Sequence, residues 1–70
     1  MNTIVTNMTG SVWRILVQAG DQIEKGQDVV ILESMKMEIP IAAEASGKVK
    51  EIKINEGDFV SDGDVLIELD

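Results

Sequence analysis

One lysine, Lys36, has neighbours in the chain that indicate chemistry. It lies between two methionines, Met35 and Met37. A lysine in a turn is usually only solvated, and methionines usually fill a core. Methionine side chains also adapt to partner surfaces, however, and two of them around one primary amine would be an unusual use of exposed apolar surface. Because a deprotonated amine is a nucleophile, the pattern indicates an amine that another protein handles.

The composition excludes most other chemistry. The 70-residue chain has no histidine and no cysteine, so it cannot build a disulfide framework, a thiol nucleophile, an imidazole base or a zinc site of the Cys/His kind. Thirteen acidic side chains against six basic ones give a net charge of −7, which opposes binding to nucleic acid through its phosphates. Residues 58–63 come close to a calcium-loop pattern, but Val60 occupies a ligand position, so we expect no metal site.

The chain also lacks the signs of a membrane segment or an export signal. Its longest unbroken apolar run is four residues, at positions 29–32. A membrane-spanning helix needs roughly 18 or more apolar residues. The first residues lack the charged and then apolar arrangement of a signal peptide. We therefore expect a cytoplasmic domain with no membrane partner. We also expect a monomer.

An internal repeat organises the chain around Lys36. Sliding the sequence by 37 positions places residues 3–33 on residues 40–70 without a gap, and eight of the 31 pairs are identical. Three of the identical pairs are glycines, which recur where turns demand backbone angles that other residues adopt poorly. Lys36 lies next to the midpoint of residues 3 and 70, close to the axis that should relate the two halves.

Both halves have the pattern of short β-strands. Residues 12–17 and their equivalents 49–54 are rich in β-branched side chains and are bounded by glycines. Only residues 23–32 compete as a helix, and they contain Gly26 and begin without a clear cap. A half of about 31 residues has too little core to fold alone. We therefore expect one all-β domain, residues 1–70, in which the halves bury each other's apolar faces as a sandwich or barrel.

These elements place Lys36 at the tip of a hairpin. Strands at residues 29–33 and 38–42 would flank the segment that joins the halves, and such a short connection is a hairpin. The chain termini belong to the other ends of the halves, so the tip should project away from them. If the segment is extended, Met35 and Met37 share one side while Lys36 points to the other.

The segment Glu33-Ser34-Met35-Lys36-Met37-Glu38 resembles the E-A-M-K-M attachment motif of biotinyl domains, the swinging-arm carriers of biotin-dependent carboxylases. The resemblance covers nearly the whole chain. Residues 8–10 are similar to the family's first turn, residues 20–27 to the approach to the attachment hairpin, and residues 46–64 to the second half. The chain starts with methionine and contains little besides this domain, so it looks most like the small stand-alone members of the biotin/lipoyl attachment family.

The resemblance implies a fold and a function. The fold is a flattened β-barrel, or barrel-sandwich hybrid, of two four-stranded sheets with pseudo-two-fold symmetry. Lys36 would be biotinylated by a biotin protein ligase, which would recognise Glu33, Ser34, Met35 and Met37. The biotin arm would then carry a carboxyl group from biotin carboxylase to a carboxyltransferase, as in an acyl-CoA carboxylase. The domain would have no catalytic residues of its own.

Departures from the family pattern leave lipoate as an alternative group on Lys36. Ser34 stands where biotinyl domains most often have alanine, and Glu33-Ser34 is closer to the lipoyl pattern, whereas the two methionines are closer to the biotin pattern. No insertion between Val17 and Gly26 is long enough to form the protruding thumb of some carriers. Three alternatives therefore stay open: a lipoyl carrier served by a lipoate ligase, a dual attachment protein that takes both biotin and lipoate, and an unmodified interaction module with the same barrel.

Two turn positions also depart from the pattern. Asn7 and Glu44 stand where the family often has proline. Because the proline ring fixes φ, we expect slightly softer turns at these positions and no change in function.

Overall fold

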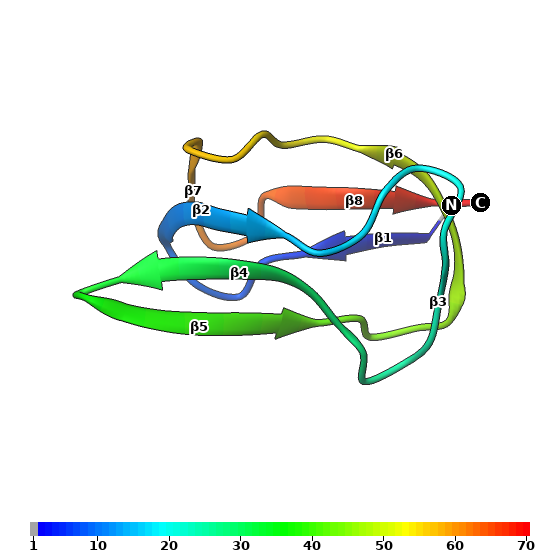
Figure 1. Ribbon diagram of the computed structural model, residues 1–70, viewed down its shortest axis with the longest axis horizontal. Helices are drawn as coiled ribbons and strands as arrows, with labels where there is room; N and C mark the ends of the chain where they lie inside the picture. Colours follow the sequence, from blue (N-terminus) through cyan, green and yellow to red (C-terminus); the bar gives the residue numbers. More distant parts are fainter. Residues whose placement is uncertain (1) are drawn as a thin grey trace.

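Eight strands form the barrel in the computed structural model, which describes residues 2–70 (Figure 1). The strands are β1 (Asn2–Val5), β2 (Gly10–Ile15), β3 (Gln22–Ile23), β4 (Asp28–Ser34), β5 (Met37–Ala42), β6 (Gly47–Ile52), β7 (Phe59–Val60) and β8 (Val65–Leu69). They make two four-stranded antiparallel sheets, in the orders β1-β8-β6-β3 and β5-β4-β2-β7. The predicted flattened β-barrel of two four-stranded sheets is confirmed. The described residues form no helix that could cross a membrane.

A shift of 37 residues relates the two sheets strand by strand. Strands β1 to β4 correspond in order to β5 to β8, and the shift converts the strand order of one sheet into that of the other. Strands β2 and β6 begin and end at equivalent residues. The bulge after Val12 in β2 recurs after Val49 in β6. The predicted pseudo-two-fold symmetry is therefore present in the backbone as well as in the residue identities.

Each sheet contains strands of both halves. In β1-β8-β6-β3 the two middle strands come from the second half and the two edge strands from the first, and the other sheet has the reverse arrangement. Further bonds join the halves: Val12 N–H donates to the Asp58 carbonyl at 2.7 Å, and the equivalent Val49 N–H donates to the Asp21 carbonyl at 2.8 Å. A half on its own would leave both edges of its central strand pair open, so neither half can complete a sheet alone.

The core between the sheets consists of side chains at equivalent positions. Of the fifteen buried hydrophobic residues in the described chain, fourteen form seven pairs related by the 37-residue shift. The pairs are Ile4/Ile41, Val12/Val49, Val17/Ile54, Ile23/Val60, Val29/Leu66, Val30/Ile67 and Leu32/Leu69. The fifteenth, Ala43, corresponds to Thr6, which is also buried and whose Oγ1 donates to the Met8 carbonyl at 2.8 Å. The two halves thus contribute equally to one core.

Four turns of the same construction close the ends of the barrel. In each turn the third residue is a glycine with φ between 91° and 97°, and the fourth residue's side chain accepts a hydrogen bond from the first residue's N–H. The turns are Gln18–Asp21, Glu24–Gln27, Asn55–Asp58 and Ser61–Asp64. In the last of them, Asp64 N–H donates to the Ser61 carbonyl at 2.9 Å, and Asp64 Oδ2 accepts from Ser61 N–H at 2.8 Å. A positive φ at the third position is what gives this turn its preference for glycine.

We expect Gly63→Ala to lower the free energy of unfolding by roughly 1–2 kcal/mol, because a side chain is disfavoured at positive φ. No atom lies within 4 Å of the Cβ that alanine would add, so the loss measures backbone conformation alone. Urea unfolding followed by Trp13 fluorescence gives the difference. Gly63→Asn is the matched control, and it should lose less because asparagine adopts positive φ more readily. An alanine variant as stable as the parent would contradict this account of the turn.

Candidate functional site

The β4–β5 hairpin carries the residues that the sequence singles out. Strand β4 ends at Ser34 and β5 begins at Met37, so Met35 and Lys36 alone form the loop. The hairpin projects from one end of the barrel, and both chain termini lie at the opposite end (Figure 1). Lys36 therefore lies at a hairpin tip, as predicted, and the two strands are each slightly longer than expected.

The loop has a left-handed backbone at both of its residues. The φ angles are 52° at Met35 and 65° at Lys36. Two-residue loops with positive φ at both positions have a twist that matches the flanking strands, and they favour asparagine and glycine. A residue other than glycine in this region costs of order 1–3 kcal/mol, so the strands must impose the conformation. The expectation of an extended, alternating backbone from Met35 to Met37 is wrong, because the chain reverses direction within these two residues.

The side chains at the tip are open to solvent. Met35 is 92% exposed and Met37 is 62% exposed, and Lys36 is exposed as well. The methionines therefore do not fill the core. The two ion pairs formed by the described residues lie on β6, on β8 and just after β6, so neither engages the tip lysine. The result is a primary amine that a partner can reach, bordered by apolar surface.

Two carboxylates lie at the base of the loop. Glu33 on β4 is directly opposite Glu38 on β5, and both are exposed. Like charges at directly opposed positions are destabilising, and here they place negative potential beside the Lys36 ammonium. Ser34 is half-buried and lies opposite Met37. The hairpin thus brings Glu33, Ser34 and Met37 together on two successive cross-strand pairs.

Gly10, the first residue of β2, supports the base of the hairpin in a way that the sequence analysis did not predict. A Cβ at this position would lie 2.7 Å from the carbonyl oxygen of Glu33 and 3.4 Å from the Cβ of Ser34. At the equivalent Gly47, the nearest atom would be Cδ1 of the Leu69 side chain, at 3.4 Å. The repeat shows both glycines in the sequence, but only the structure shows that Gly10 is the one packed against hairpin backbone.

Two hydroxyl residues tie the loops together at equivalent places. Thr9 Oγ1 accepts a hydrogen bond from Asp62 N–H at 3.3 Å, and Ser46 Oγ accepts one from Lys25 N–H at 3.1 Å. Thr9 and Ser46 are 37 residues apart, and each precedes the first residue of a strand. The 37-residue spacing of these two hydroxyl residues is visible in the sequence, but their hydrogen bonds are visible only in the structure. The bond to Thr9 fixes the Thr9 loop next to Gly10 and so helps to hold the base of the hairpin.

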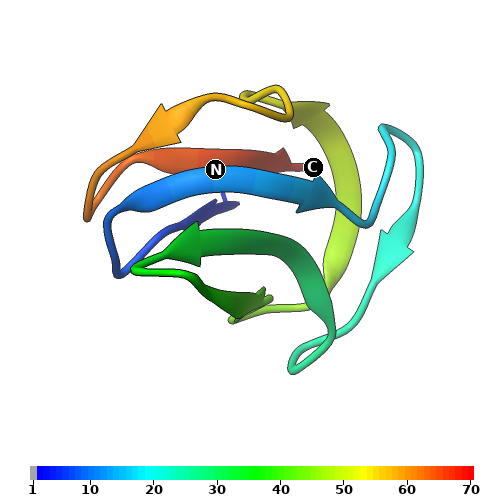
Figure 2. The ribbon, with the colours of Figure 1, turned by 60° about the vertical axis from the view of Figure 1, so that its left-hand side comes forward.

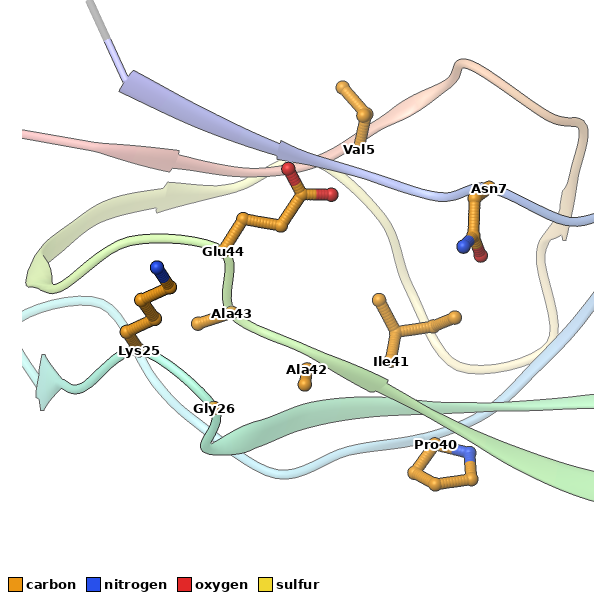
Figure 3. A pocket seen from close by; sticks show the side chains of 9 residues that line it. All are labelled: Val5, Asn7, Lys25, Gly26, Pro40, Ile41, Ala42, Ala43 and Glu44. Carbon is orange, nitrogen blue, oxygen red and sulfur yellow. The ribbon is translucent and has the colours of Figure 1, made fainter.

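A groove of about 540 Å³ lies beside β5, away from the loop (Figure 3). It is lined by the end of β1, the turn before β4 and the second half of β5 with the residues that follow, and none of residues 33–38 takes part. Asn7 and Glu44, the two departures from the family's prolines, both line it, as does Lys25 (Figure 3). No group of three or more potential metal ligands occurs in the described chain. Among the described residues, the groove therefore contains no group of metal ligands, and the hairpin remains the candidate functional site.

A lysine at the tip of a two-fold β-barrel has a counterpart among known proteins. The family model described as "Biotin-requiring enzyme", of the biotin/lipoyl type, matches residues 2–69. The chain belongs to the biotin/lipoyl attachment family. It is therefore an attachment domain, which acts as a carrier and not as a catalyst, and biotin is the group that the family is described as requiring.

The relatives of this attachment domain include short proteins and a small part of a large carboxylase. The Biotin/lipoyl attachment protein of Bacillus subtilis (strain 168) is 66% identical over 67 residues, which are 96% of this chain and 92% of that protein. The Biotinylated protein TB7.3 homolog of Mycobacterium leprae (strain TN) is 44% identical over 59 residues, 84% of this chain and 83% of that protein. The crystal structure of Kluyveromyces lactis urea carboxylase matches with a TM-score of 0.86 at 36% identity, over 94% of this chain and 6% of that chain.

We expect Gly10→Ala to destabilise the attachment domain more than Gly47→Ala. At position 10 the added methyl group meets backbone, so we expect a loss of about 1–3 kcal/mol in the free energy of unfolding and displaced amide resonances in residues 33–38. At position 47 only the end of a leucine side chain has to move, so the loss should be smaller. Urea unfolding and NMR of both variants measure these effects. Equal losses, or unshifted hairpin resonances in Gly10→Ala, would contradict the role assigned to Gly10.

Proposed function

We propose that the chain is a biotin carboxyl carrier in which a biotin protein ligase acylates Nζ of Lys36. The observation that supports this most is an exposed primary amine at the apex of a two-residue loop, between two exposed methionines, in a member of the biotin/lipoyl attachment family. Glu33, Ser34, Met35 and Met37 surround the amine and form the proposed recognition motif for the ligase.

The geometry of the loop fits a covalent arm. Lys36 is exposed on a projecting hairpin, so the ligase can take in its amine while the strands stay paired. In the reaction, Nζ loses a proton and attacks the acyl carbon of biotinyl-adenylate. An amide C–N bond forms, the anhydride C–O bond breaks, and AMP leaves with the bonding electrons. The ligase supplies the activated acyl group, and the carrier supplies only the positioned amine.

Acylation changes the charge of the tip. The positive charge of Lys36 is lost, while Glu33 and Glu38 stay beside it, so the modified hairpin is more acidic than the bare one. When attached, biotin supplies a ring nitrogen that can accept and release a carboxyl group. The barrel keeps the anchor of the arm in place, which raises its effective concentration at the biotin carboxylase and carboxyltransferase sites of an acyl-CoA carboxylase. The acidic tip favours partners with basic surfaces.

Lipoate on the same lysine is the second candidate function. The pair Glu33-Ser34 favours it, since that pair is closer to the lipoyl pattern than to the biotin pattern. The name of the Bacillus subtilis relative also includes both groups. Either group would be held through an amide at Nζ of Lys36, so the geometry of the hairpin does not distinguish them. Met35 and Met37 on both sides of the lysine are the reason to prefer biotin.

Intact-mass spectrometry of the protein made in cells that contain both ligases tests the proposal. We expect a single biotinyl addition on the parent chain and none on Lys36→Ala. Lys36→Arg is the matched control that keeps the positive charge, and it should also stay unmodified because a guanidinium is not nucleophilic at neutral pH. A lipoyl addition would replace the first candidate with the second. An unmodified parent, or a modified Lys36→Ala, would contradict both.

A further inference from the structure

The outer face of the sheet β5-β4-β2-β7 carries large apolar side chains. Trp13 is 40% exposed and Phe59 is 68% exposed, Pro40 is exposed, and Ile31 is half-buried. Together with the exposed Arg14 they are named here the hairpin face. Strands β4 and β5 of this face continue directly into the loop that presents the lysine. The face is therefore joined to the proposed attachment site by two paired strands.

The strand register places these side chains in two adjacent rows across the sheet. Arg14 on β2 lies opposite Ile31 on β4, which lies opposite Pro40 on β5. Trp13 lies beside Arg14 in the β2 bulge, and Arg14 Cζ is 4.9 Å from the centre of the indole ring. Phe59 on β7 lies opposite Ser11 of β2, in the neighbouring row, which is nearer the hairpin tip and continues to Glu33. Figure 2 shows β2, β4 and β5 side by side, with β4 leading into the hairpin tip. The hairpin face is thus a strip that crosses the whole sheet.

The other sheet shows that folding does not require this apolar strip. At the equivalent positions Trp13, Arg14, Ile31, Pro40 and Phe59 are replaced by Lys50, Glu51, Glu68, Thr3 and Gln22, respectively. There the register is the same, with Glu51 opposite Glu68 and Glu68 opposite Thr3, and Lys50 forms an ion pair with Glu68 at 3.5 Å. The same barrel thus folds with polar side chains at these five positions of the other sheet. The apolar strip on the other sheet therefore marks a surface for a partner.

From this difference we infer that the hairpin face docks onto the ligase that acylates Lys36; the inference rests on the function proposed above. Before acylation the amine extends only one lysine side chain beyond the loop, so the ligase must come close to the hairpin and to the face continuous with it. Tryptophan and arginine are the residues that most often dominate binding energy at protein interfaces. Glu33 and Glu38 border the strip toward the tip. The face thus fits a ligase surface with an apolar centre and a basic margin.

Enzymes that use the acylated arm do not need this face to the same degree. The arm extends well beyond the lysine side chain, so it can enter a distant site while the barrel stays further away. The bare lysine has no such reach. Contact with the hairpin face is therefore expected during attachment of the arm, and the affinity of the ligase for the unmodified carrier is the quantity that reports it.

The test is steady-state biotinylation at varied carrier concentration, with a purified biotin protein ligase. The double variant Trp13→Lys with Phe59→Gln introduces the residues found at the equivalent positions of the other sheet, so the barrel should accept them. We expect the KM for the carrier to rise by about tenfold or more, with kcat unchanged because the lysine and its loop are intact. The matched control, Gln22→Ala with Lys50→Ala on the other sheet, should stay within about twofold of the parent.

The outcomes separate this inference from the proposed function. If the double variant has the same KM as the parent protein, the docking inference is wrong and the attachment of biotin is unaffected. A parent protein that is not biotinylated would contradict the proposed function itself. If the double variant is biotinylated normally but transfers carboxyl groups poorly, the face belongs to the carboxylase and the ligase assignment is overturned. The ligase assignment is also overturned if the parent is a dimer and the double variant is not, because the face then joins two copies of the chain. If urea unfolding shows that the double variant is unfolded, Phe59→Gln alone, on the short edge strand β7, gives the same test with the same expected direction.

Discussion

The exchange of edge strands between the two halves is the constraint on which the rest of the molecule depends. Each half contributes a central strand pair to one sheet and the two edge strands of the other. The core is therefore shared, and fourteen of the fifteen buried hydrophobic side chains among residues 2–70 occur as symmetric pairs. The chain has no disulfide to stabilise a half on its own. Each sheet is complete only when both halves are present, and the segment that joins the halves is then fixed in place as well.

This constraint also explains why the lysine lies where it does. Strands β4 and β5 belong to different halves but are neighbours in one sheet, so the connection between the halves is a hairpin at the end of that sheet. The paired strands hold Met35 and Lys36 in a left-handed conformation that neither residue prefers, and Gly10 lets β2 approach the backbone at the base of the hairpin. The proposed site is thus a single side chain on a rigid support, and it needs no cleft of its own.

The strand arrangement and the position of Lys36 could largely be predicted from the sequence, because the repeat is visible as identical residues at equivalent positions. The paired glycines and the β-branched runs predict two equivalent halves of short strands, and the midpoint of the repeat predicts the position of Lys36. The left-handed loop could not be predicted, because Met35-Lys36 contains neither the asparagine nor the glycine that usually signals it. The different surroundings of Gly10 and Gly47, and the two unlike outer faces, depend on which strands become neighbours, and the repeat alone does not show that.

In the proposed function, the ligase recognises Lys36 as the folded barrel presents it, and the linear motif alone is not enough. The most direct test compares kcat/KM for biotinylation of the folded domain with that for a linear peptide of residues 28–42, which contains Lys36 as its one lysine. The folded domain should be preferred by about 100-fold or more, because the scaffold removes the cost of ordering the hairpin. Equal values for the domain and the peptide would contradict recognition of the folded barrel.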